Sequence, residues 1–147
     1  MGNRGTIVLV GVASTERDGK AIIGVERETP LYFSTHWTGD SLEAVARTAC
    51  KIAADNGRVE GDTGVFARVL FCELLKTEDN DGVLGFRITT EDSDDHDVPP
   101  LVIDCAYRTV YEVKETSEGP RLGGILQALK LPRRPADTKR LKKLFTF

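Results

Sequence analysis

The first third of the chain alternates short apolar runs with polar stretches. An apolar run at 6–13 and a second run at 20–25 are joined by a polar stretch that ends in Asp18-Gly19. Because this dipeptide favours tight hairpin turns, the two runs predict a β-hairpin. The aromatic and β-branched segment 31–35 predicts a third strand.

Helical spacing follows the third strand. Between Asp40 and Gly57, apolar residues recur every three or four positions, and Asp40 with Glu43 forms a capping-box pattern, so we expect an amphipathic helix. The next segment, 65–76, is apolar almost all round. Its length favours a buried helix, with a strand as the alternative, since periodicity does not separate the two in a continuous apolar run.

The second half predicts two more strands. One covers 83–90, and the longest covers 101–113, where alternate residues place Leu101, Cys105 and Tyr111 on one face. We expect this face to pack on the helices and the other face to stay open, so that the sheet is half covered. Helical spacing at 122–129 predicts a short helix, weakened by the pair Gly123-Gly124.

The order β-β-β-α-α-β-β predicts an α+β fold: a single antiparallel or mixed sheet of about five strands, with two helices on one face. We expect residues 1–131 to form this domain and 132–147 to form a basic amphipathic C-terminal tail. A chain of 147 residues with 40% apolar residues is large enough to bury a core without disulfides or metals.

Charge is distributed unevenly along the chain. Residues 1–129 hold 13 Lys and Arg against 22 Asp and Glu, a net charge of −9, whereas 130–147 hold 7 against 1, a net charge of +6. Such a tail either folds back onto the acidic body or binds a partner. Its basic residues suit phosphates, and its apolar residues, placed opposite the charges, suit a groove on a protein. The residues concerned are Arg133, Arg134, Lys139, Arg140, Lys142 and Lys143 on the basic side, with Leu141, Leu144 and Phe145 on the apolar side.

The three cysteines, Cys50, Cys72 and Cys105, are widely spaced in apolar stretches, which is typical of buried thiols in a reducing compartment. No apolar run approaches the roughly 20 residues that span a bilayer. We therefore expect a cytoplasmic protein that does not contact membranes.

Cofactor and metal signatures are missing from the sequence. It has no Walker loop, dinucleotide fingerprint, zinc spacing or G-x-S-x-G. The acidic loop 91–97 lacks the glycine and glutamate of an EF-hand, which favours a solvated loop. We expect no cofactor and no bound metal.

The end of the third strand is the most site-like position. His36-Trp37 lies beside Asp40, so the carboxylate could tune the imidazole as a base while the tryptophan anchors a partner. The structural alternative is that Trp37 closes one end of the core and Asp40 caps the helix. Cys105 with a histidine could also form a nucleophile and base, although no local signature surrounds it.

The segment from Pro30 to Val113 contains His36-Trp37-Thr38-Gly39, an alanine-rich helix and late tyrosines at 107 and 111. It resembles a family of small, mostly uncharacterised proteins of bacteriophages and other mobile elements, whose motif is His-Trp-Asp-Gly-Tyr-Pro. Thr38 stands where that family has aspartate, and the Tyr-Pro pair is absent. The resemblance implies a mobile-element origin and no established activity.

These features favour a small non-enzymatic accessory protein that engages a protein partner through the His36-Trp37 end and the basic tail. One alternative is a small hydrolase that uses His36, Asp40 or Cys105. The other is non-specific nucleic-acid binding through the tail, which would depend steeply on salt.

Overall fold

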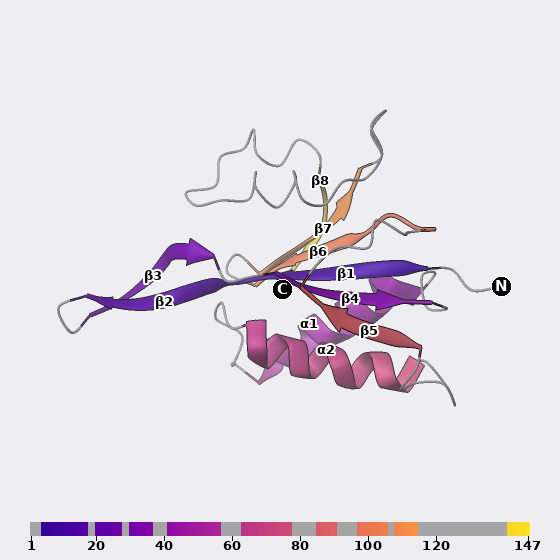
Figure 1. The fold of residues 1–147 in the computed structure, drawn as a ribbon, viewed down its shortest axis with the longest axis horizontal. Helices are drawn as coiled ribbons and strands as arrows, with labels where there is room; N and C mark the ends of the chain where they lie inside the picture. The colour runs from indigo at the N-terminus through magenta and orange to yellow at the C-terminus, as the bar shows by residue number, and fades with distance from the viewer. Residues whose placement is uncertain are drawn as a thin grey trace.

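A computed structural model shows a mixed β-sheet with two helices against one face, an α+β fold of the class that the sequence predicts (Figure 1). The structure describes residues 4–17, 20–27, 30–36, 41–56, 63–77, 85–90, 97–105, 108–114 and 141–147. Its elements are β1 (Gly5–Val10), β2 (Val12–Arg17), β3 (Lys20–Arg27), β4 (Leu31–Thr35), α1 (Leu42–Asp55), α2 (Thr63–Thr77), β5 (Phe86–Thr89), β6 (Leu101–Asp104), β7 (Thr109–Val113) and β8 (Leu141–Thr146). The expected helix at 122–129 lies outside the described residues.

The main sheet has six strands in the order β5-β4-β1-β6-β7-β8, one more than expected. Its central pair, β1 and β6, is parallel, with Ile7 opposite Leu101 and Val10 opposite Asp104. Every other neighbouring pair in this sheet is antiparallel. The parallel pair has the continuous apolar sequences that strands covered on both faces require.

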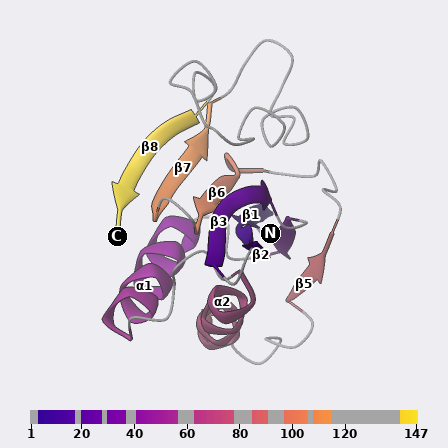
Figure 2. The ribbon, with the colours of Figure 1, turned by 90° about the vertical axis from the view of Figure 1, so that its left-hand side faces the viewer.

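The two helices cover one side of the sheet, here called the helix face. Ile7 and Leu9 of β1 and Ile103 of β6 point toward them and belong to one buried core with Phe66 and Leu70 of α2. Along the sheet, α1 lies toward β7 and β8, and α2 lies toward β5 (Figure 2). Fully buried apolar side chains of this kind each stabilise the fold by roughly 1.5–3 kcal/mol relative to exposure.

The opposite side of the sheet, here called the far face, is also buried, so the expectation of a half-covered sheet is wrong. Its side chains form a second core in which no member is more than 6% exposed. The members are Val8, Val10, Tyr32, Val102, Tyr111, Val113 and Leu141. The physical reason is the composition of β1 and β6, whose successive residues are apolar on both faces.

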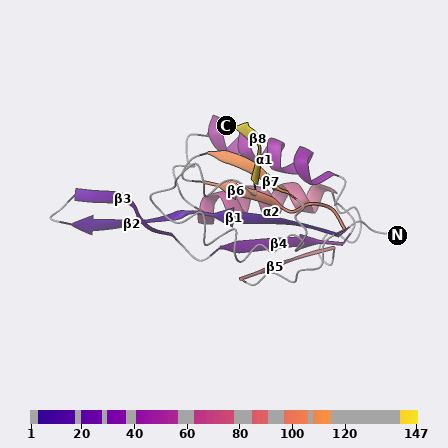
Figure 3. The ribbon, with the colours of Figure 1, turned by 90° about the horizontal axis from the view of Figure 1, so that it is seen from above.

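An N-terminal hairpin is present, but its first strand is 12–17 and not the run 6–13 that the sequence predicted, and it lies outside the main sheet. β2 pairs with β3 in antiparallel register, and Arg17 lies opposite Lys20. The apolar run at 6–13 is divided, because β1 joins the main sheet and β2 begins at Val12. The hairpin extends beyond the end of the main sheet (Figures 1 and 3).

The long strand expected at 101–113 is instead a hairpin of β6 and β7. Asp104 pairs with Thr109, and the turn between them contains Arg108 in the left-handed region at φ 53°. This turn changes the face on which later residues lie. Val110 belongs to the helix-face core, whereas Tyr111, expected on the helix face, lies on the far face.

Both helices are confirmed, with one change at an N-terminus. α1 begins after Ser41, which makes no side-chain capping hydrogen bond, and Asp40 lies outside the described residues. α2 settles the ambiguous apolar segment 65–76 as a helix that begins at Thr63. The strand expected at 83–90 is β5, of four residues; positions 83 and 84 are not described.

The C-terminal residues of the expected basic tail form a strand, β8, at one edge of the main sheet. β8 pairs with β7 and places Glu112 opposite Lys142. The guanidinium of Arg47 in α1 lies over the ring of Phe145 at 4.4 Å, and Phe147 packs against Phe66 of α2 at 5.9 Å. This part of the basic segment therefore folds onto its own domain.

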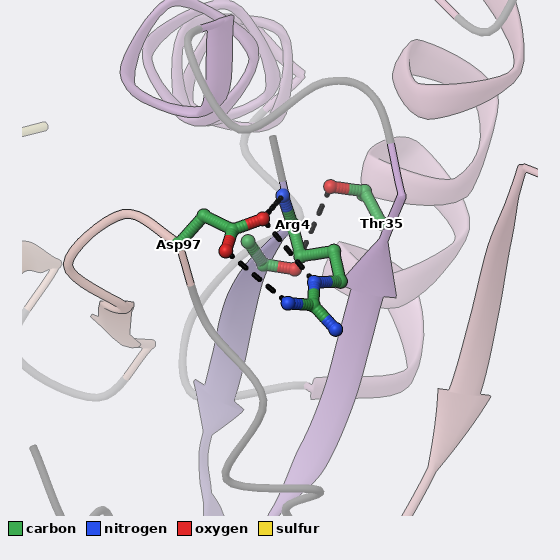
Figure 4. Close-up of polar contacts among 4 residues, drawn as sticks. Arg4, Thr35 and Asp97 are labelled. Carbon is green, nitrogen blue, oxygen red and sulfur yellow. Dashed lines mark hydrogen bonds and ion pairs between the residues drawn. The ribbon is translucent and has the colours of Figure 1, made fainter. Parts of the chain in front are cut away.

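A polar contact joins the start of β1 to the segment before β6 (Figure 4). The Asp97 carboxylate accepts hydrogen bonds from the backbone N–H of Arg4 at 2.8 Å and from its Nε at 3.2 Å. In return, the Asp97 N–H donates to the Arg4 carbonyl at 2.8 Å. Beside them, the Thr35 hydroxyl donates to the Gly5 carbonyl at 3.5 Å. The Arg4–Asp97 bonds connect the start of β1 to the segment that leads into β6, and the Thr35–Gly5 bond connects β4 to β1.

Candidate binding surface

An apolar groove lies between α2 and the edge strand β5. It has a volume of about 310 Å³ and is lined by Phe71, Leu75, Phe86, Arg87 and Ile88. We call it the α2–β5 groove. Its size is at the lower end of small-ligand pockets, about 300–1,000 Å³, so it can take one or two side chains.

The strand supplies one wall of the groove through alternate residues. Phe86 and Ile88 are two positions apart and so share a face, and Ile88 lies opposite the buried Phe33 of β4. Phe86 packs into the helix-face core, but Ile88 is 44% exposed, because β5 is the last strand on this side of the sheet.

The helix supplies the other wall. The ring of Phe71 meets that of Phe86 edge to face, with 5.4 Å between ring centroids, an arrangement favoured by aromatic quadrupoles. Phe71 is nevertheless 40% exposed. Phe71 and Ile88 are the two large apolar side chains that stay exposed within the described part of the chain.

The described charges around the groove are mainly positive. Arg87 lines it, and Arg68 lies on α2 one turn before Phe71; both are exposed, and neither forms an ion pair with another residue that the structure describes. Lys76 is paired: it donates a hydrogen bond to Glu73 at 2.8 Å, which raises the pKa of Lys76. Two guanidinium groups thus flank an apolar surface.

His36, the first candidate from the sequence, lies near one end of this groove. It follows β4, is exposed, and donates its backbone N–H to the Gly85 carbonyl at 3.0 Å. Phe86, which lines the groove, is the next residue and pairs with Thr35. Trp37 and Asp40 lie outside the described residues, so their relation to His36 stays a prediction.

Cys105 is not brought to His36. The Cys105 N–H bonds the Val10 carbonyl at one end of β1, whereas His36 follows Thr35, which pairs with Gly5 at the other end. At about 3.3 Å per residue, β1 separates these ends by roughly 17 Å. A nucleophile and its base need contact within about 3 Å. Cys105 is also fully buried, and burial raises the pKa of another helix-face thiol, Cys50, to about 12.

The apolar tail residues proposed as a docking surface are used within the protein. Leu141 is buried on the far face, and Leu144 and Phe145 pack against the helix-face core. Lys142 and Lys143 are exposed on β8. The remaining basic candidates, Arg133, Arg134, Lys139 and Arg140, are not described.

The α2–β5 groove was not predicted from the sequence. One signal was present: α2 is apolar almost all round, which gives more apolar surface than one core-facing stripe uses. The exposure of Ile88 had no such signal, because it depends on β5 being an edge strand.

Within the described residues, no group of three or more histidine, cysteine or acidic side chains is placed to hold a metal ion. No helix among them is long and apolar enough to cross a bilayer. Comparisons with protein-family models, curated proteins and solved structures find no match.

Proposed function

We propose that this chain is a small non-enzymatic accessory protein, encoded by a phage or mobile element and working in the cytoplasm, that binds a protein partner through the α2–β5 groove. The observation that carries the proposal is the pair of exposed side chains, Phe71 and Ile88, beside an edge strand. Exposed apolar surface beside a strand that has no second neighbour among the described residues favours association with another polypeptide.

The structure changes which surface is the better candidate. The sequence favoured the His36-Trp37 end together with the tail, but Leu141, Leu144 and Phe145 are engaged in the cores. His36 remains a candidate binding residue, because its backbone N–H bonds Gly85 at the end of the groove. His36 and Cys105 lie at opposite ends of β1, roughly 17 Å apart along the strand, so this proposal does not use them as a nucleophile and base.

The test is affinity capture from nuclease-treated host lysate with three forms of the full chain: the natural protein, Ile88→Asp and Lys143→Asp. The two variants place the same charge on opposite edges of the main sheet, at exposed positions. We expect a discrete protein to be retained by the natural chain and by Lys143→Asp and to be lost with Ile88→Asp.

Two results would contradict the proposal. A partner that is lost only with Lys143→Asp would place the contact on β8. Retention of nucleic acid that falls steeply with salt and with Lys143→Asp would favour phosphate binding by the basic segment.

A further inference from the structure

Among the described residues, β5 is the last strand at its edge of the main sheet. β5 pairs with β4 on one side, and no described strand lies on its other side. In an antiparallel pair, every second residue directs its N–H and C=O away from the partner. β5 therefore offers backbone donors and acceptors along the groove, which is the arrangement that binds extended peptides by β-augmentation.

A strand added there would meet the groove with alternate side chains. It would lie about 4.8 Å beyond β5, and residues directly opposite each other share a face. Side chains opposite Phe86 and Ile88 would lie on the helix face and reach the exposed part of Phe71. The groove volume of about 310 Å³ accommodates one or two such apolar side chains.

In the added strand, the residue between the two that face Phe86 and Ile88 would lie opposite Arg87. Arg87 is an exposed guanidinium without an ion-pair partner among the described residues. Arginine pairs with carboxylates through two parallel hydrogen bonds, so it favours an acidic residue here. The charge complementarity rests on Arg87, since Arg68 lies on α2 at the helix face. The acidic residues of 78–84 and 91–95 lie outside the described residues.

We infer that the partner contributes an extended segment with the pattern apolar–acidic–apolar, which pairs with β5 and places its carboxylate opposite Arg87. This inference rests on the proposed function and names the chemistry of its ligand. The expected partner is a different protein, and the test below also detects pairing with a second copy of this chain.

The experiment selects peptides from a displayed library of random seven-residue sequences on the full-length protein. We expect apolar–acidic–apolar triplets to be enriched on the natural chain, apolar–basic–apolar triplets on Arg87→Glu, and neither on Ile88→Asp. A change of preference from acidic to basic peptides also shows that Arg87→Glu is folded, because an unfolded variant would enrich neither kind of peptide.

A selected peptide then tests backbone pairing. Replacing its central acidic residue by lysine should weaken binding about tenfold or more. Methylating alternate backbone nitrogens should abolish binding when the methylated positions face β5 and leave it unchanged when they face away. Dissociation constants from fluorescence anisotropy give both comparisons.

The inference is overturned if selection is unchanged by Arg87→Glu, if no peptide is enriched, or if both methylation patterns bind equally. It is also overturned if light scattering shows a dimer of the natural chain that Ile88→Asp dissociates, since a second copy would then occupy β5. If one of the three peptide results fails but affinity capture still depends on Ile88, the proposed function stands and only the peptide pattern is wrong. The proposed function itself is wrong if Ile88→Asp captures the same proteins as the natural chain.

Discussion

At the scale of single residues, the contact between Arg4 and Asp97 joins the start of β1 to the segment before β6. Both side chains are partly exposed, yet the contact combines side-chain and backbone hydrogen bonds in both directions. The hydrogen bonds donated by Arg4 hold the pKa of Asp97 below its ordinary value of 3.8. Asp97 therefore stabilises the fold in its charged form.

We expect Asp97→Asn to lower the free energy of unfolding at pH 7. Because the folded-state pKa of Asp97 is depressed, its contribution is fully present above the ordinary pKa of 3.8 and is lost as pH falls through the folded-state value. Urea midpoints of the natural and Asp97→Asn chains should thus differ at pH 7, begin to approach each other below about pH 4 and meet below the folded-state pKa of Asp97.

The control is the Arg4→Gln background, in which Asp97→Asn should have a smaller effect at pH 7. An equal effect in both backgrounds would show that Arg4 is not the partner that stabilises the Asp97 charge.

At the scale of elements, the C-terminal strand is part of the fold. β8 extends the sheet beyond β7 and brings Leu141 onto the far face and Phe145 onto the helix face. Its exposed lysines, Lys142 and Lys143, protect the outer edge from pairing with other chains. A chain that ends at Leu131 would lack β8. It would therefore lose both folding stability and any binding, so point variants separate these two effects better than truncation does.

We expect Leu141→Ala to lower the free energy of unfolding by about 2–5 kcal/mol, because it removes a buried side chain from the far face. The matched control is Lys142→Gln, the neighbouring exposed residue, which should stay within about 0.5 kcal/mol. Urea unfolding measures both. Equal midpoints for Leu141→Ala and the natural chain would show that β8 does not pack as described.

The elements differ in how far their sequences predict them. The N-terminal hairpin, β4 and both helices follow from turn residues and from helical spacing, which are local signals. The β6–β7 turn had no such signal, because Cys105 to Arg108 includes no glycine, proline or asparagine, and Arg108 adopts a positive φ. The alternation of apolar residues in β6 continues through the turn into β7, so the sequence predicts one long strand.

Other features depend on contacts between distant segments. The sequence 141–146 has apolar residues at spacings compatible with a helix, and pairing with β7 makes it a strand. The α2–β5 groove exists because β5 is last in the strand order. His36, by contrast, was found from its position at a predicted strand end, which the structure confirms for β4.

At the scale of the whole molecule, stability is concentrated at the centre of the sheet. β1 and β6 are buried on both faces, whereas β2 and β3 pair with each other outside the main sheet. A two-stranded ribbon is at best marginally stable alone in water. We therefore expect local stability to be highest in β1 and β6 and lower in the ribbon of β2 and β3.

We expect native-state hydrogen exchange to be slowest at the amides of β1 and β6 and fastest, among the strands, in β2 and β3. Mass-spectrometric or NMR exchange at neutral pH separates the two groups. Protection of β2 and β3 equal to that of β1 would contradict this order and would indicate that another surface covers the ribbon.

The parallel pair also affects how the chain folds during synthesis. Ile7 pairs with Leu101, so β1 leaves the ribosome about 94 residues before its partner, an interval of roughly 5–20 s at about 5–20 residues per second. Until then, the apolar run of β1 has β4 as its one neighbour in the sheet. Such distant pairing slows folding, and it makes nascent β1 a segment that chaperones would bind.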